Sequence, residues 1–158
     1  GSEMCIRDRY MRKSFVSCID HYDEEGIILE KLKITVGGKE FYAKLLQDKA
    51  PKTIAQMKEY GPIHTVMHAA KVVNEEVMCP APYFYEAKEN PVFDQDPGNV
   101  CFYAQKHTIA IFFGDVIPVA DCPNFAKIEE DSLPGFQEVA RTAWKNQGQP
   151  ITFEVVNV

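Results

Sequence analysis

The sequence lacks the features that mark several specialised classes of protein. No uninterrupted apolar run in its 158 residues approaches the ~20 residues that a membrane-spanning helix needs. No positively charged segment leads into an apolar one, so a secretory signal peptide is not expected. The formal net charge of −6 argues against nucleic acid, because nucleic-acid binding relies on a basic surface. We therefore expect a cytoplasmic protein with neither nucleic acid nor a membrane as its partner.

Closely spaced cysteine pairs are also missing. The five cysteines include no C-x-x-C pair, and their odd number leaves at least one without a disulfide partner. This pattern is typical of a reduced compartment. Cys79 would need a base such as His68 to act as a nucleophile, and no oxyanion-hole motif accompanies it. A buried structural thiol is therefore the favoured interpretation.

Residues 1–30 differ from the rest of the chain. Gly1–Ser2 resembles a remnant of tag removal, and "SEMCIRDRY" resembles a stretch that recurs at the start of unrelated metagenomic proteins as translated adapter DNA. We expect a non-native or flexible N-terminal extension here, followed by one domain over residues 31–158. The alternative is a genuine arm that packs on the domain or on a neighbouring subunit, which leaves a homo-oligomer open.

The body of the chain does contain regular alternation of apolar and polar residues. The side chains of Leu32, Ile34 and Val36 share one face, and a second alternating run follows Gly37–Gly38. Two such runs around a Gly-Gly turn predict a β-hairpin. The later run "TIAIFF" (108–113) is apolar at almost every position, which predicts a strand that is buried on both faces.

Two helices are predicted among the strands. The first covers about residues 51–60, with a proline at its start and a glycine after its end. The second covers about residues 134–146, where apolar residues including Phe136 and Trp144 recur on one face. About eight short strands with only two helices predict a mainly β protein, a closed barrel whose open ends the helices cover.

Six stretches follow one another in the body of the chain: "LLQDKAPKTI" (45–54), "HA" (68–69), "NEEVMCPAP" (74–82), "ENPVF" (89–93), "PGNVCFY" (97–103) and "IAIFFGDVIP" (109–118). In this order they resemble small prokaryotic cyclophilin-like proteins of unknown function. The resemblance covers about residues 31–156 and implies a cyclophilin-like eight-stranded β-barrel.

The catalytic arginine of prolyl isomerases has no counterpart. In cyclophilins it lies on the strand after the first helix, in an "F-H-R" element, but here that region reads "IHTVMHAAKVV". Beyond residue 30 the only arginine is Arg141, in the second predicted helix. An isomerase needs a cationic donor at the prolyl nitrogen to lower the ~20 kcal/mol barrier, and the point charge of Lys71 lacks the rigid fork of a guanidinium. Efficient prolyl isomerisation is not expected.

Two motifs between the helices carry ionisable side chains. His64 and His68 have the H-x-x-x-H spacing, which on a helix would direct both rings at one metal ion. We interpret the segment as a strand, on which four residues span roughly 13 Å, so neither a metal nor another cofactor is predicted. Glu75 and Glu76 belong to "NEE", interpreted as a turn between two extended runs. Either these two glutamates lie at a solvated hairpin tip without a functional role, or one of them acts as a general base or anchors a ligand.

We predict that a small molecule binds in a pocket at the side of the barrel. An enzymatic role in small-molecule metabolism stays open, with His68 and Glu75 as the catalytic acid–base pair. Two alternatives are a prolyl isomerase with a degenerate site and a non-catalytic module that binds a peptide or a partner protein. The predicted ligand-binding residues are Met78, Tyr85, Tyr103 and Phe113.

Overall fold

A computed structural model describes residues 28–81 and 88–158 of the chain. The prediction of an N-terminal extension falls almost entirely outside these residues and stays a prediction. No helix in the described part is long and apolar enough to cross a membrane. The strands are β1 (Glu30–Val36), β2 (Lys39–Leu45), β3 (Ile63–Ala69), β4 (Asn74–Pro80), β5 (Pro91–Val92), β6 (Asn99–Tyr103), β7 (Thr108–Val116), β8 (Cys122–Ile128) and β9 (Gln149–Asn157).

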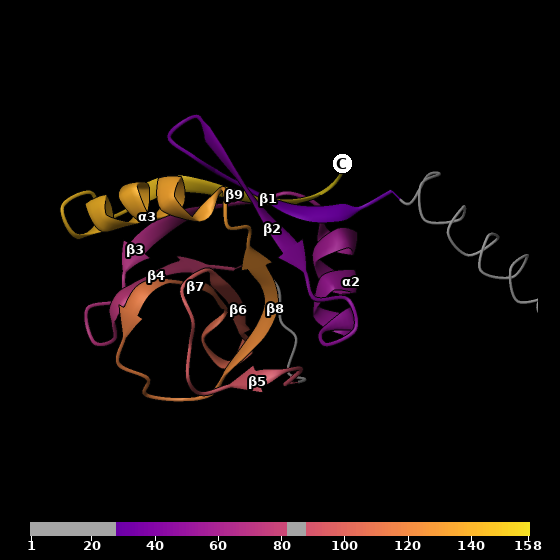
Figure 1. Ribbon diagram of the computed structural model, residues 1–158, viewed down its shortest axis with the longest axis horizontal. Helices are drawn as coiled ribbons and strands as arrows, with labels where there is room; N and C mark the ends of the chain where they lie inside the picture. The colour runs from indigo at the N-terminus through magenta and orange to yellow at the C-terminus, as the bar shows by residue number, and fades with distance from the viewer. Residues whose placement is uncertain (1–27, 82–87) are drawn as a thin grey trace, which may run out of the picture.

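Eight of these strands close into a barrel (Figure 1). The strand order is β2-β1-β9-β3-β4-β7-β6-β8, and an additional pairing of β2 with β8 joins the two ends of the sheet. Every strand pair is antiparallel, and the short β5 pairs only with β8. The predicted closed, eight-stranded barrel is therefore confirmed. Closure gives each of the eight strands a paired strand on both sides, although β3 and β4 pair only through His68–Met78 and Ala69–Val77.

The first hairpin forms where the alternation predicts it. Val36 pairs with Lys39, so Gly37 and Gly38 are the two loop residues, with φ of 58° and 77°. A two-residue turn that matches the twist of the strands needs positive φ at both positions, which glycine adopts without steric cost. The inward side chains of β1, including Leu32 and Ile34, are fully buried.

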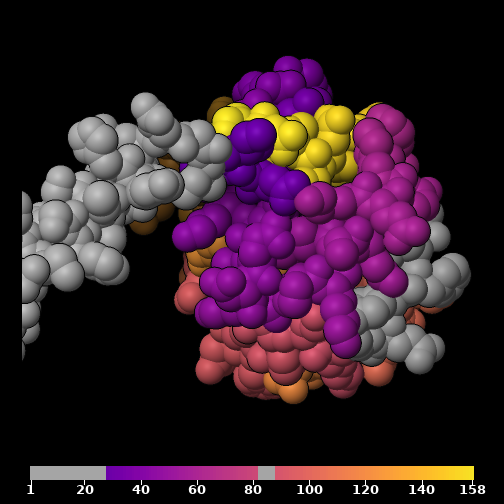
Figure 2. Space-filling view, turned by 90° about the vertical axis from the view of Figure 1, so that its right-hand side faces the viewer, coloured from indigo at the N-terminus to yellow at the C-terminus, as the bar shows by residue number. Residues whose placement is uncertain are grey.

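The two helices pack on different sides of the barrel. Helix α2 (Pro51–Tyr60) matches the predicted bounds, and its buried Ile54 and Met57 join the same core as the inward side chains of the strands. Figure 2 shows α2 on the face between the yellow β9 and the salmon segment that contains β5. The carboxylate of Glu89 accepts hydrogen bonds from the backbone N–H groups of Lys52 and Thr53. This carboxylate therefore satisfies two donors that the first turn of a helix leaves unpaired.

The second helix is shorter than predicted. Helix α3 (Leu133–Arg141) continues only as the 3₁₀ turn η2 (Thr142–Trp144). Phe136 and Ala143 are fully buried as expected, but Trp144 is 50% exposed. The change from α to 3₁₀ geometry alters the number of residues per turn, and the tryptophan therefore leaves the apolar stripe.

Strand β7 is buried on both faces, as its sequence predicts. Its inward side chains, Ile109, Ile111 and Phe113, belong to the barrel core. Its outward side chains, Ala110 and Phe112, belong to a second, smaller apolar cluster with Cys101 and Cys122. The chain after β7 and the segment that contains η1 (Ala104–Lys106) line the same side of the barrel. A covered surface therefore exists outside the barrel wall as well as inside it.

Candidate functional site

The second apolar cluster lies beside a cavity of about 320 Å³, which we call the outer cavity. This volume is at the lower end of the range for small-molecule sites. Its floor is the outward face of β4, β6 and β7, and its walls are the β3–β4 turn and the loop between β7 and β8. The lining residues are Ala69–Val73, Glu76, Met78, Gln95, Tyr103, Lys106, Thr108, Ala110, Phe112 and Pro118–Cys122.

The strand register orders the floor of the outer cavity into rows. Glu76 of β4 lies opposite Phe112 of β7, and Met78 lies opposite Ala110. Farther along, Thr108 lies opposite Tyr103 of β6. Directly opposed residues of antiparallel strands share a face. An acidic end at Glu76, an apolar middle at Ala110 and an aromatic end at Tyr103 therefore follow one another along the strands.

Among the described residues that line the outer cavity, Glu76 is the only buried acidic one, at 8% exposure. Over residues 28–81 and 88–158, no group donates a hydrogen bond to its carboxyl oxygens and no cation forms an ion pair with them. Burial raises the pKa of Glu76 to about 7, although the positive charge of Lys106 acts in the opposite direction. A carboxyl with a pKa near neutrality can both accept and donate a proton in this cavity.

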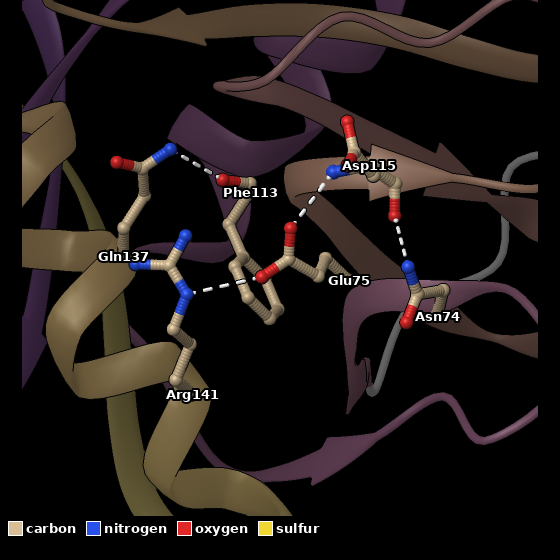
Figure 3. A network of polar contacts seen from close by, with 6 residues as sticks. All are labelled: Asn74, Glu75, Phe113, Asp115, Gln137 and Arg141. Carbon is tan, nitrogen blue, oxygen red and sulfur yellow. Dashed lines mark hydrogen bonds and ion pairs between the residues drawn. The ribbon is translucent and has the colours of Figure 1, made fainter.

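The adjacent Glu75 lies on the opposite face of β4 from Glu76, and Figure 3 shows the contacts of its carboxylate. Its carboxylate accepts a hydrogen bond from the backbone N–H of Asp115 at 2.8 Å and another from Nε of Arg141 at 3.0 Å. The bond from Asp115 is the main reason that the pKa of Glu75 is lowered, and Arg141 adds to it. Gln137 of α3 donates to the carbonyl oxygen of Phe113 beside it. This network ties β4 and β7 to α3.

The prediction that "NEE" forms the turn is wrong. The turn precedes it at residues 70–73, and Asn74 begins β4 with φ of 74° while its side chain donates to the carbonyl oxygen of Asp115. Asparagine tolerates the left-handed conformation better than most residues, which explains its place at the end of the turn. Glu75 and Glu76 are consequently strand residues, and successive strand residues point to opposite faces.

The structure does not bring the proposed acid–base pair together in the outer cavity. His68 lies opposite Met78 in the β3–β4 pair, yet neither His68 nor Glu75 lines the cavity. The histidine segment is a strand, as predicted, and the Nδ1 atom of His64 lies 3.1 Å from Oγ1 of Thr152. The catalytic roles of His68 and Glu75 stay predictions from the sequence.

The predicted ligand-binding residues occupy different places. Met78 and Tyr103 line the outer cavity. Phe113 points into the barrel core and is 2% exposed. Tyr85 lies outside the described residues. The alternation in "TIAIFF" contained a signal for the missed residues, because it places Ala110 and Phe112 on the face opposite Phe113.

The three cysteines of the described residues fall on both faces of the barrel wall. Cys79 is fully buried in the core, and burial raises the pKa of its thiol. Cys101 and Cys122 lie on the outward face, where the Cys101 thiol contacts the side-chain oxygen of Asn124. Burial raises the pKa of Cys101 as well. Over the part of the chain that the structure describes, no three His, Cys, Asp or Glu side chains are arranged to hold a metal ion.

Comparisons with known proteins bear on both family and fold. The model of a family described as "Protein of unknown function (DUF3830)" matches residues 32–154, which confirms the resemblance to an uncharacterised family. No curated protein matches the sequence.

Two solved structures have the same fold. The structure of McbB in complex with tryptophan matches with a TM-score of 0.64 and 18% identity, over 80% of this chain and 43% of that chain. This chain thus spans less than half of the McbB chain. The solution structure of the hypothetical protein AF2241 from Archaeoglobus fulgidus matches with a TM-score of 0.57 and 18% identity, over 85% and 98% of the two chains. At this identity the likeness shows the fold alone.

Proposed function

Since the chain belongs to the DUF3830 family of proteins of unknown function, we propose from its own geometry that it binds a small molecule in the outer cavity and exchanges a proton with it through Glu76. One observation carries the proposal. The side chain of Glu76 lines this cavity, the residue is 8% exposed, and its carboxyl has no hydrogen-bond partner among the described residues. Burial disfavours the ionised form of this carboxyl, so a ligand group that pairs with it would recover part of that cost.

The surroundings of Glu76 suit proton transfer at neutral pH. The other charged residues that line the cavity in the described part of the chain are Lys71, Lys106 and Asp121, and all three are exposed to solvent. The buried Cys101 thiol also lies close enough for the charge of Glu76 to raise its pKa. Because solvent weakens the exposed charges, burial dominates and leaves the carboxyl poised between its two states. General acids and bases work best with a pKa near the operating pH.

A titration of Glu76 combined with ligand binding tests the proposal. The side-chain carboxyl of Glu76 is followed by carbon NMR between pH 4 and 9, and backbone amide shifts of Ala110 and Thr108 are followed during addition of 3-phenylpropan-1-ol or tryptophan. Tryptophan is included because McbB, a protein of the same fold, binds it in its solved structure. We expect a midpoint near 7 and saturable shifts that cluster on the cavity floor. An ordinary carboxyl midpoint together with no shift at the cavity would refute the proposal.

A second candidate function is the binding of a protein partner at the mouth of the cavity. Val72 of the β3–β4 turn and Val119 of the loop after β7 both line the mouth and are exposed, as is the nearby Ile117. The backbone N–H of Ile117 donates to the carbonyl oxygen of Val73, which holds the two segments together. Exposed apolar side chains in one patch can mark an interaction surface. Binding of a partner protein that is lost in Val72→Ser and unaffected in Glu76→Gln would favour this function.

A further inference from the structure

We infer that the ligand of the outer cavity is an elongated organic anion. Its carboxylate would lie beside Lys106, its apolar body over Ala110, and a hydrogen-bonding group at its other end against Glu76. This inference rests on the proposed function, because it names the class of molecule that occupies the same cavity.

The length of the cavity follows from the strand register. Glu76 and Pro80 of β4 are four residues apart, and Pro80 lies opposite Thr108, which in turn lies opposite Tyr103. Four strand residues span roughly 13 Å, so the backbone at the two ends of the floor is separated by about this distance, and the side chain of Lys106 shortens it because its charge reaches Glu76. Between them the strand register places Met78, Ala110 and Cys101, and none of these side chains is charged at neutral pH. A ligand that contacts both ends therefore needs an apolar body between two polar groups.

The aromatic end of the cavity carries a cation. Nζ of Lys106 lies 5.6 Å from the centre of the Tyr103 ring, which directs the lysine over the cavity floor. No carboxylate forms an ion pair with Lys106 in the described part of the chain. An ammonium group with three donors and no acidic partner suits an anionic group of the ligand. The phenol of Tyr103 adds a further donor at this end.

Two other exposed charges bear on the orientation of the ligand. Lys71 belongs to the β3–β4 turn, which lies at the Glu76 end, because the backbone N–H of Ala70 donates to the carbonyl oxygen of Glu76. Asp121 precedes Cys122 and would repel an anion from the wall of the cavity. Lys71 lies in the wall at the Glu76 end, whereas Lys106 extends from the Tyr103 end and its charge also acts on Glu76. Lys106 is therefore the better anchor.

A set of four probes tests both ends of the ligand. The probes are 3-(4-hydroxyphenyl)propanoate, 3-phenylpropanoate, 3-(4-hydroxyphenyl)propan-1-ol and 3-phenylpropan-1-ol, which differ only in the carboxylate and the phenol group. Affinities are measured by NMR titration at pH 6 and low salt. We expect the carboxylates to bind about tenfold more tightly than the matching alcohols, as a charge-assisted hydrogen bond provides. The phenol group should add about threefold through a hydrogen bond to Glu76.

Matched variants assign each preference to a residue. Lys106→Met should reduce the preference for the carboxylate to about twofold or less, and the matched control Lys71→Met should leave it near tenfold. Glu76→Leu should abolish the preference for the phenol group while the preference for the carboxylate persists. Asp121→Asn should strengthen carboxylate binding about twofold, because it removes a like charge.

The outcomes separate this inference from the proposed function. If the uncharged 3-phenylpropan-1-ol binds in the cavity and the carboxylate adds nothing, the inference is overturned and the proposed function stands. If the carboxylate preference disappears in Lys71→Met instead of Lys106→Met, the ligand lies in the reverse orientation and the inference is also overturned. If none of the four probes shifts the signals of the cavity floor, both fail.

Discussion

Two adjacent glutamates on opposite faces of β4 have pKa values that are shifted in opposite directions. On one face, Glu75 accepts hydrogen bonds from a backbone N–H and from Arg141, and its pKa is lowered. On the other face, Glu76 has no such partner among the described residues, and burial raises its pKa to about 7. The two side chains have the same chemistry and neighbouring positions in the chain. Their surroundings alone decide that one fastens β4 and β7 to α3 and the other can exchange a proton.

A carboxyl group with hydrogen-bond partners and one without them have different effects on stability and on proton transfer. A carboxylate that is already hydrogen-bonded strengthens the structure as long as it stays ionised, which makes it a poor proton donor near neutral pH. A buried carboxyl without partners weakens the structure when it ionises, and this cost is what a bound ligand can relieve. The first arrangement favours stability and the second favours function.

The network on the Glu75 face can be broken without touching a charged residue. A Cβ atom at Gly114 would lie 1.9 Å from Oε2 of Glu75, so Gly114→Ala should force the carboxylate away from Asp115 and Arg141. We expect a loss of about 3 kcal/mol in the free energy of unfolding, measured in urea at pH 7. In a Glu75→Ala background the same substitution should cost much less. An equal cost in both backgrounds would place the strain in the backbone instead of in the carboxylate.

The Glu76 face should respond to substitution in the opposite direction. Because its pKa is higher in the folded than in the unfolded protein, Glu76 lowers stability as the pH rises from about 4.5 to about 7. Glu76→Gln should therefore be more stable than the natural protein by about 3 kcal/mol at pH 9 and little different at pH 4. Thermal and urea unfolding across this pH range measure the effect. A destabilised variant at pH 9 would show that the ionised carboxylate has favourable partners.

Glu75→Gln is the matched control for Glu76→Gln, because it makes the same chemical change at the neighbouring residue. The pKa of Glu75 is lowered on folding, so its contribution to stability is present above the unfolded pKa and is lost as the pH falls through the folded one. We expect the variant to lose about 1 kcal/mol at pH 7, and the difference should vanish in acid. The same urea series measures it. The comparison fails if both glutamine variants shift stability in the same direction at pH 8.

Arg141→Met should have the smallest effect. The guanidinium side chain is 55% exposed, so water screens its attraction to Glu75. We expect a loss of about 0.5 kcal/mol at low salt and less at 1 M salt, measured by urea unfolding. Binding of 3-phenylpropan-1-ol in the outer cavity should not change, because Arg141 lies on the other face of β4. A change in that binding would mean that the two faces are coupled through the strand.

The sequence predicted the scaffold well because its strands, turns and helix ends follow from patterns of residues that are close together in the chain. The alternation over residues 31–46 and the two glycines predicted the first hairpin, and Pro51 with Gly61 predicted the bounds of α2. The double burial of "TIAIFF" followed from its composition. These features depend on residues close together in the chain, and their physical causes act at that range.

The candidate site was less predictable because it depends on which alternate residues of β4 face the outer cavity. The sequence predicts a turn at "NEE", but the turn lies at residues 70–73. Glu75 and Glu76 are therefore strand residues that face opposite ways. A shift of one residue exchanges the faces of a strand, and no local pattern in "NEEVM" reveals which face is covered. Met78 and Tyr103 were predicted as ligand-binding residues and do line the cavity, whereas the side chain of Phe113 points into the barrel core.

By itself, the sequence determined that this chain forms a mainly β barrel with two helices and that it lacks the arginine of prolyl isomerases. Only the tertiary structure decided which glutamate the outer cavity contains. Glu76 meets Phe112 across β4 and β7, and the charge of Lys106 acts on Glu76 from the segment before β7. The pKa of a carboxyl is set by what surrounds it in space. Those neighbours come from strands and loops that are distant in the chain and converge only when the barrel closes.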